Sequence, residues 1–234
     1  MPRAKDVPGD AKTMFDAMRA FFRRCRSLQF YYLVISLVLL LALYPYVGRT
    51  GALLKVLTSV VLITGVYAVS NRRRQIAIAL VLALPAFAAG WLFLITGLPL
   101  LDTVESAFTL AFYTFTTLVV LSRVLTSEEV TSDTISGAVS VYLLLGITWA
   151  TAYDIVAAIH PGSFASAGIL AYPDYLYFSF VTLATLGYGD ITPLTDQTRS
   201  LAMLEAVTGV LYTAVLIARL VAARGWSPRQ GRGQ

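Results

Sequence analysis

Charged residues are scarce in this sequence. They make up 13% of its 234 residues, whereas 57% of the residues are hydrophobic. A soluble domain usually has about 25% charged and about 45–50% apolar residues, so this composition excludes an ordinary soluble protein. The apolar residues also gather into long blocks, as a bilayer core of about 30 Å requires of helices of roughly 20 residues. We therefore predict an all-α integral membrane protein.

Cysteine and histidine are almost absent. The single cysteine, Cys25, excludes an internal disulfide framework and a metal-thiolate cluster. The single histidine, His160, falls near the outer end of a predicted helix, where an ordinary interfacial role is favoured over pH sensing. No nucleophile with its base and no phosphate-binding loop stands out, so we predict neither an enzyme nor a bound cofactor.

Negative charge is also in deficit, because 18 Lys and Arg stand against 13 Asp and Glu. The placement of the basic residues fits membrane topology. If the amino terminus is cytoplasmic, only Arg49, Lys55 and Arg199 fall on the outer side. The positive-inside rule then predicts that both termini are cytoplasmic, and the basic excess needs no nucleic-acid partner.

Six apolar segments are predicted to cross the membrane. Their approximate ranges are 28–47, 52–70, 75–97, 103–125, 134–160 and 199–223. A composition shift around Ser127 divides them, which predicts a four-helix domain at 28–126, a linker at 127–133, a second membrane domain at 134–223 and a short cytoplasmic tail at 224–234. Residues 1–27 combine aromatic and basic residues at helical spacing, which predicts an amphipathic segment on anionic lipid.

A shorter apolar block, Pro173 to Ala184, lies between the last two segments. It is too short to cross a bilayer, so we interpret it as a re-entrant helix whose carboxyl end points into the membrane. Gly187 and Gly189 follow it at alternate positions. Glycine reaches positive φ at little steric cost, so alternate glycines allow successive backbone carbonyls to face one axis. Rings of carbonyls can replace the water shell of a cation.

Residues 185–190 read Thr-Leu-Gly-Tyr-Gly-Asp, after an aromatic helix and before a final span. This pattern resembles the signature of the tetrameric potassium channel family, over about residues 134–223. The resemblance implies a homotetramer that conducts K⁺ passively, with K⁺ as the permeating ligand. It also implies a selectivity filter, braced by the Tyr188 ring, that consists of Thr185, Leu186, Gly187, Tyr188 and Gly189. The carbonyls of the first four, with the Thr185 hydroxyl, would bind the ions.

Other residues are expected to support this filter. The resemblance implies that Asp190 bonds back to the short helix, with Tyr177 as its candidate partner and Thr182 as a further support. Some family members carry a carboxylate where this chain has Val181, which leaves the strength of this bracing open. Glu205, in the last span, is expected either to brace the filter through the short helix or to hold a proton, and bracing is favoured.

The last span is expected to line the inner pore. Gly209 matches the family's hinge glycine, although close packing of a small residue explains it equally well. Thr213, Ile217 and Val221 share one face at spacings of four residues. This stripe is expected to line the inner cavity and its gate, and packing on the fifth span is the alternative.

The fourth span has Arg123 as its one basic residue. Steep voltage dependence needs about three to four gating charges per subunit, so we predict weak or absent voltage gating. Lys55 is expected to extend to the outer surface, and Asp154 to lie near the outer interface.

Three alternatives stay open at this point. A non-selective cation channel of the same fold would usually lose the Gly-Tyr-Gly pattern, and a potassium uptake transporter would carry four filter repeats in one chain. A non-conducting sensor or scaffold is the third. The compact size and the family resemblance suggest a bacterial inner membrane.

Overall fold

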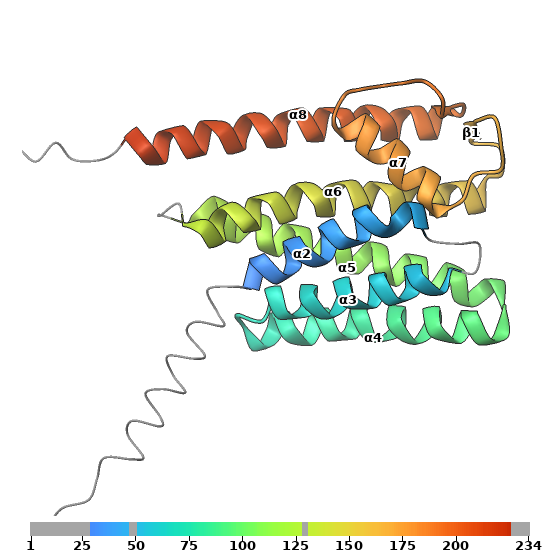
Figure 1. Cartoon of the computed structure of the whole chain (residues 1–234), viewed down its shortest axis with the longest axis horizontal. Coiled ribbons are helices and arrows are strands. Elements are labelled where there is room, and N and C mark those ends of the chain that lie inside the picture. The colour runs from blue at the N-terminus through green and yellow to red at the C-terminus, as the bar shows by residue number, and fades with distance from the viewer. Residues whose placement is uncertain (1–28, 47–50, 128–130, 226–234) are drawn as a thin grey trace, which may run out of the picture.

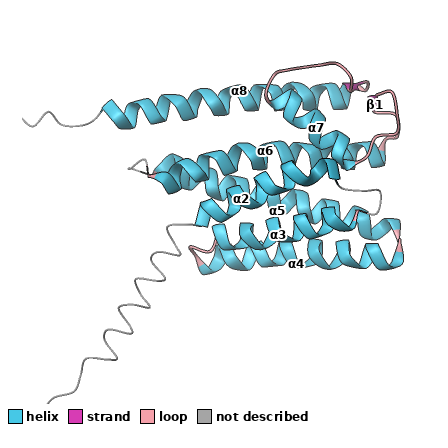
Figure 2. Cartoon of the chain, viewed as in Figure 1, coloured by secondary structure: helices cyan, strands magenta, loops and turns pink. Residues whose placement is uncertain are grey.

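The computed structural model describes residues 29–46, 51–127 and 131–225, and most of them are helical (Figures 1 and 2). The predicted segment 1–27, the centre of the predicted linker and the end of the tail lie outside these ranges. The helices are α2 (Gln29–Leu43), the 3-10 helix η1 (Tyr44–Tyr46), α3 (Ala52–Ala68), α4 (Arg73–Thr96), α5 (Pro99–Thr126), α6 (Ser132–Ile159), α7 (Tyr172–Leu183) and α8 (Asp196–Gly225). Two short strands, β1 (Phe164–Ala165) and β2 (Thr192–Pro193), pair antiparallel.

Four of the helices, α4, α5, α6 and α8, are long and apolar enough to cross a membrane. The other two predicted spans correspond to α2, with 15 residues, and α3, with 17 residues, which are apolar but shorter. A 15-residue α-helix is about 22 Å long, less than the bilayer core of about 30 Å. The structure thus confirms a mainly helical protein with candidate membrane helices, and six crossings stay a prediction.

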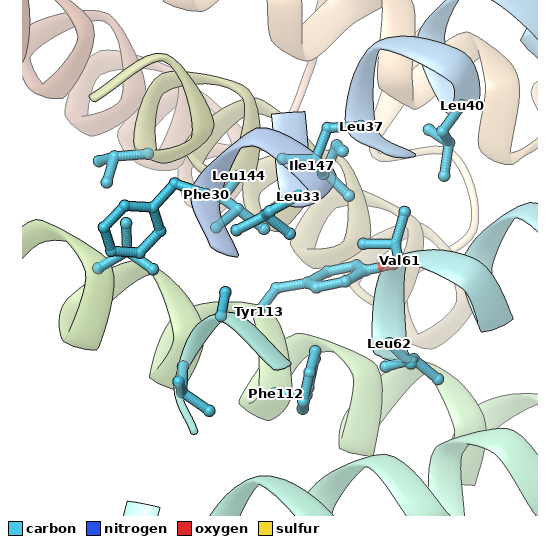
Figure 3. Packing of buried hydrophobic residues seen from close by; sticks show 14 of the residues in the cluster. Phe30, Leu33, Leu37, Leu40, Val61, Leu62, Phe112, Tyr113, Leu144 and Ile147 are labelled. Carbon is cyan, nitrogen blue, oxygen red and sulfur yellow. The ribbon is translucent and has the colours of Figure 1, made fainter. Parts of the chain in front are cut away.

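The helices α2, α3 and α5 pack with α6 around a common apolar core. Leu33, Leu37 and Leu40 recur on one face of α2 and are fully or almost fully buried. That face meets α6 and α3, and Figure 3 shows Leu33 and Leu37 close to Ile147, with Tyr113 reaching toward Val61. The core explains why α2 folds against the rest of the chain despite its short length, because burying one leucine side chain stabilises by about 1.5–3 kcal/mol.

Arg123 ties α5 to the end of α3. Its guanidinium donates to the carbonyl oxygens of Ala68 at 2.7 Å and Val69 at 3.1 Å, and to the Gln75 side chain at 2.9 Å. The last carbonyls of a helix have no partner within the helix, and a basic side chain can satisfy them. Arg123 therefore caps α3 and joins it to α4 and α5.

The prediction that Lys55 extends to the outer surface is wrong. Its side chain is 13% exposed and forms an ion pair with Glu105, with Asp102 at 3.9 Å. Its amino group also lies 5.5 Å from the centre of the Phe93 ring. The carboxylates on α5 hold the amino group between the helices, because an ammonium group at this depth is more stable beside an acid than alone.

In the back half of the chain, the short helix α7 lies between α6 and α8 (Figure 1). It spans Tyr172–Leu183, one residue earlier than the predicted 173–184. Pro173 occupies its first turn, where a missing N–H costs nothing, and the Asp174 carboxylate accepts the Ala171 N–H at 2.7 Å. A carboxylate in the first turn also stabilises the helix dipole.

Helix α8 differs from the other long helices in its burial. Only 11% of its most apolar 18-residue window is buried, compared with 50% for α6. Its outer turns pack on α7 and α6 (Figure 1), and further along the Tyr212 hydroxyl donates to the Ala138 carbonyl of α6 at 2.6 Å. Most of the apolar surface of α8 is therefore open in a single chain.

Candidate functional site

The segment after α7 has an alternating backbone. Thr185, Gly187 and Gly189 have φ angles of 58°, 60° and 80°, and Leu186 and Tyr188 between them do not have positive φ. Thr185 is the one non-glycine residue with positive φ among the described residues. A β-branched residue in this region costs of order 1–3 kcal/mol, which persists only where the surroundings enforce it. The alternation is the backbone pattern that turns successive carbonyls toward one side.

Hydrogen bonds fix this segment to the carboxyl end of α7. The N–H of Thr185 donates to the carbonyl of Thr182 at 2.9 Å, and the N–H of Leu186 donates to the carbonyl of Val181 at 2.9 Å. These two bonds hold the turn that places Thr185 in its strained conformation. The segment begins where α7 carries the partial negative charge of its dipole, which favours a nearby cation. Thr182, predicted as a support, thus acts through its backbone carbonyl, and its side chain is half-buried.

The side chains and glycines of the segment are uncovered in one chain. Leu186 is 59% exposed and Tyr188 is 67% exposed. A Cβ added at Gly187 or Gly189 would meet no atom of this chain within 4 Å. The Tyr188 ring, which the sequence predicts as a brace, is therefore not buried by any side chain in the described part of this chain.

Asp190 lies at the outer end of the segment. Its carboxylate pairs with the hydroxyl of Tyr177 on α7, and both residues line a small hollow beside the loop from Ser166 to Leu170. This is the partner that the sequence predicts for Asp190. The interaction joins the two ends of the segment, since Tyr177 lies on the helix that precedes it.

Glu205 is fully buried on α8 and joins three helices. Its carboxyl oxygens lie 2.5 Å from the Tyr153 hydroxyl on α6 and 2.5 Å from the Ser179 hydroxyl on α7. The Ser179 hydroxyl also lies 2.7 Å from the carbonyl of Gly146. Sequence reasoning did not identify Ser179 or Tyr153, although a lone serine inside the aromatic α7 helix was an available signal. Glu205 contacts the short helix α7 directly through Ser179, as a residue that braces this helix from α8 would.

The oxygens around Glu205 outnumber the hydroxyl protons that can bond to them. Two hydroxyl protons, on Tyr153 and Ser179, face three acceptor oxygens, namely both oxygens of Glu205 and the carbonyl of Gly146. A proton on Glu205 completes the set, because the acid then donates to Ser179 while Ser179 donates to Gly146. Bracing and holding a proton, the two roles predicted for Glu205, are compatible in this arrangement.

The predicted inner-pore residues lie on α8. A Cβ at Gly209 would come within 2.3 Å of the Leu183 carbonyl oxygen, so the missing side chain allows α8 to approach the end of α7. Thr213, Ile217 and Val221 are exposed. The neighbouring face, with Tyr212 and Leu216, packs on the core instead. Within one chain, the predicted stripe therefore does not pack on α6.

Comparison with known proteins gives a consistent picture of the back half. Residues 141–223 match the family model described as "Ion channel". The chain is 35% identical over 82 residues to Two pore potassium channel c of Oryza sativa subsp. japonica, which covers 34% of this chain and 16% of that protein. It is 36% identical over 94 residues to the inward rectifier potassium channel Kirbac3.1 of Paramagnetospirillum magnetotacticum, which covers 38% of this chain and 29% of that protein. In both relatives the similarity spans less than a third of their length.

A further relative is matched over most of its length. Protein LctB of Bacillus caldotenax is 31% identical over 106 residues, which is 42% of this chain and 78% of that protein. No solved structure is significantly similar to the chain. Ion channels conduct ions and do not catalyse a reaction, so the matches agree with the prediction that the chain is not an enzyme. Together, the matched family model and the relative covered over most of its length show that the chain belongs to the ion channel family.

Proposed function

We propose that this chain is one subunit of a homotetrameric, potassium-selective channel. The observation that carries the proposal is the alternating positive φ at Thr185, Gly187 and Gly189, directly after the carboxyl end of the short helix α7. The similarity of the back half to two potassium channels supports the choice of ion. K⁺ is the permeating ligand, and the proposed channel needs no cofactor.

The proposed ion sites use backbone oxygens. Carbonyls of residues 185–188, with the Thr185 hydroxyl, would replace the hydration shell of K⁺ as it enters. The carboxyl end of α7 would lower the cost of a cation in this region of low dielectric. Asp190 and Glu205 would hold the filter against α7 from its two sides, through Tyr177 and Ser179.

Four copies are proposed because one chain supplies one wall of the ion path. A ring of carbonyls needs repeated copies around an axis, and a closed cyclic assembly provides them. The open surface of α8 supports this assembly, since Met203, Val207 and Val210 are each more than 50% exposed. In the tetramer, neighbouring copies would cover part of α8 and the ring of Tyr188, while Thr213, Ile217 and Val221 would line the inner cavity.

We further propose six crossings with both termini in the cytoplasm of a bacterial cell. The short helix α2 is continued by η1, which extends its reach. Three consecutive arginines, Arg72, Arg73 and Arg74, lie at the α3–α4 turn, at the end opposite to the filter, and favour that end as cytoplasmic. Arg123 lies on the same side, where its bonds to α3 fix it in place, so we propose weak or absent voltage dependence.

Flux in liposomes tests the proposal. We expect the purified protein to pass K⁺ and to exclude Na⁺, and we expect Gly187→Ala to abolish this selective flux. The added methyl group disfavours the φ of 60° that the proposed filter needs.

Gly97→Ala is the matched control. Gly97 also has positive φ, at 66°, with no atom within 4 Å of an added Cβ, and it lies at the α4 end, outside the filter. This variant should keep selective flux. Equal K⁺ and Na⁺ flux would favour a non-selective channel, and loss of flux in both glycine variants would show that the effect is not specific to the filter.

A further inference from the structure

The segment that leaves the proposed filter is held by a second set of contacts, separate from the bond between Asp190 and Tyr177. Its strand β2 pairs antiparallel with β1, with Ala165 opposite Thr192. Figure 1 shows β1 beside the outer end of α6 and the start of α8. Each strand has 2 residues, and an isolated two-stranded pairing is only marginally stable in water. Other contacts must therefore keep this pairing in place.

One backbone carbonyl, that of Ser163, receives hydrogen bonds from two segments. The N–H of Leu194, just after β2, donates to it at 2.9 Å, and the hydroxyl of Thr198, in the first turn of α8, donates to it at 3.1 Å. Ser163 is itself fixed to the end of α6, because its hydroxyl donates to the carbonyl of His160 at 2.5 Å. This carbonyl therefore joins the end of α6, the segment after the filter and the start of α8.

The Thr198 side chain is fully buried at this junction. Its N–H donates to the Thr195 hydroxyl at 3.3 Å, which is the side-chain cap at the amino end of α8. Its own hydroxyl lies 3.0 Å from the Thr195 carbonyl as well as 3.1 Å from that of Ser163. A buried hydroxyl needs such acceptors, and this one places its proton between two segments of the chain. Thr198 is thus both part of the α8 cap and a link to the end of α6.

The residue after Ser163, Phe164, inserts its ring between α6 and α7. The ring centre lies 5.6 Å from that of Tyr153 on α6, and 5.3 Å and 5.4 Å from those of Tyr175 and Phe178 on α7. Rings at such distances attract each other beyond the effect of burial alone. The first residue after the filter motif, Ile191, is buried in the same cluster. The cluster therefore sets the distance between α7, which precedes the filter, and the segment that follows it.

The two ends of the proposed filter are held differently. At the inner end, the N–H groups of Thr185 and Leu186 bond to carbonyls of α7. Further along, a Cβ added at Gly187 or Gly189 would meet no described atom of this chain within 4 Å, so the same chain does not hold this stretch from the side. The direction in which the chain leaves the filter therefore depends on the contacts that follow it.

We propose that Thr198 and Phe164 are positioning residues for the outer ion sites of the filter. The inference rests on the proposed function, because it assigns a role toward the proposed ion sites. Neither side chain contacts an ion. They hold β1, β1 holds β2, and β2 fixes the course of the backbone beyond Gly189. A ring of carbonyls distinguishes cations by the number and placement of its oxygens, so a looser outer end reduces the preference for K⁺ over Na⁺.

Two measurements on the purified full chain test this role. The permeability of K⁺ relative to Na⁺ is read from reversal potentials in planar bilayers. The temperature of thermal unfolding is then compared in K⁺ and in Na⁺ solution. An ion that binds the folded protein raises its unfolding temperature, so the increment in K⁺ reports binding at the ion sites without any flux.

Thr198→Val keeps the side-chain shape and removes the hydroxyl. We expect it to lower the selectivity for K⁺ over Na⁺ by about fivefold, the effect of one net hydrogen bond, and to reduce the K⁺ increment in unfolding temperature. Thr198→Ser keeps the hydroxyl and should retain both properties. Phe164→Leu removes the ring contacts and should act in the same direction as Thr198→Val, which gives a second reading if that variant does not fold.

Ser36→Ala is the matched control, because Ser36 is buried in the front half and its hydroxyl lies 2.7 Å from that of Thr64. This variant should lower the unfolding temperature equally in both ions and leave the selectivity unchanged. The same result for Thr198→Val and Phe164→Leu would overturn the proposal, because it would show a structural role alone. Loss of selectivity in Thr198→Ser would overturn it too.

The original chain separates this inference from the proposed function. If the chain shows neither K⁺ selectivity nor a K⁺ increment in unfolding temperature, the proposed function fails and this inference fails with it. If the chain shows both, and Thr198→Val and Phe164→Leu keep both, the proposed function stands and the positioning role alone is refuted.

Discussion

The front helices α2–α5 and the back helices α6–α8 differ in where their apolar side chains face. In the front half, Leu33, Val61 and Phe112 are fully buried in a core shared with α6. In the back half, Leu204, Leu211 and Val215 on α8 are each more than 50% exposed. The front half builds a core within one chain, although its outer faces still expose Ile63, Val81 and Leu84. The α8 helix of the back half has much less of its apolar window buried, 11% against 28% for α4 and 39% for α5. Both halves therefore need other molecules to cover them, and α8 needs them most.

The two halves also treat buried polar groups differently. Glu205 in the back half is surrounded by hydroxyl groups and closes a network between three helices. Lys55 and Glu105 in the front half form an ion pair that opens onto a cavity. The first arrangement fixes the position of the proposed filter, and the second joins α3 to α5. The following variants test whether this difference holds.

The largest effect is expected from Glu205→Ala. It leaves the hydroxyls of Tyr153 and Ser179 without their partner and opens a cavity between α6, α7 and α8. We expect a loss of stability on the order of 3 kcal/mol. Thermal unfolding of the purified protein measures this loss of stability. Gel filtration of the same sample reports whether its oligomeric state also changes.

Glu205→Gln is the matched variant. An amide donates to Ser179 and accepts from Tyr153, as the protonated acid would, so we expect a loss below about 1 kcal/mol. Equal losses in the Ala and Gln variants would indicate a carboxylate at this position instead of a protonated acid. A stable Glu205→Ala protein would show that this network does not hold the back half together.

Gly209→Ala is expected to have an intermediate effect. Its Cβ would overlap the backbone carbonyl of Leu183, which cannot move without shifting the end of α7, so we expect a loss of about 1–3 kcal/mol. At Gly146 an added Cβ would instead meet the far end of the Phe180 ring, at 2.5 Å. A ring can turn aside, so Gly146→Ala should cost less.

Thermal unfolding of both variants, together with K⁺ flux, separates packing from a hinge. A packing role lowers stability in Gly209→Ala more than in Gly146→Ala. If the Gly209→Ala protein is as stable as the original chain and only its channel opening changes, the result supports a hinge at Gly209 and refutes the packing role.

The sequence predicted those features that depend on local chemistry. The short helix was predicted at 173–184 and is found at 172–183, because Pro173 marks its first turn and the glycines mark its end. The positions that need positive φ were likewise predictable at Gly187 and Gly189. Thr185 was not, because its conformation is imposed by hydrogen bonds to α7 and not by its own side chain.

Features that depend on distant contacts were not predictable in the same way. Lys55 was expected at the surface, but its partner Glu105 lies 50 residues away and reaches it only after α4 and α5 have folded back. The partners of Glu205 on α6 and α7 are similarly remote in sequence.

The smallest effect is expected from Arg123→Gln, which tests whether the front half responds to voltage. The guanidinium bonds to Ala68 and Val69 are replaced at best by one amide, so we expect a stability loss of about 1 kcal/mol. Arg74→Gln, at an exposed arginine in the first turn of α4, is the matched control and should not change stability. Current–voltage curves in planar bilayers should have the same steepness in both variants, because a charge bonded to the end of α3 cannot cross the field without breaking those bonds. A shallower curve in Arg123→Gln alone would mean that Arg123 moves with voltage, and that the closed packing of the front half opens during gating.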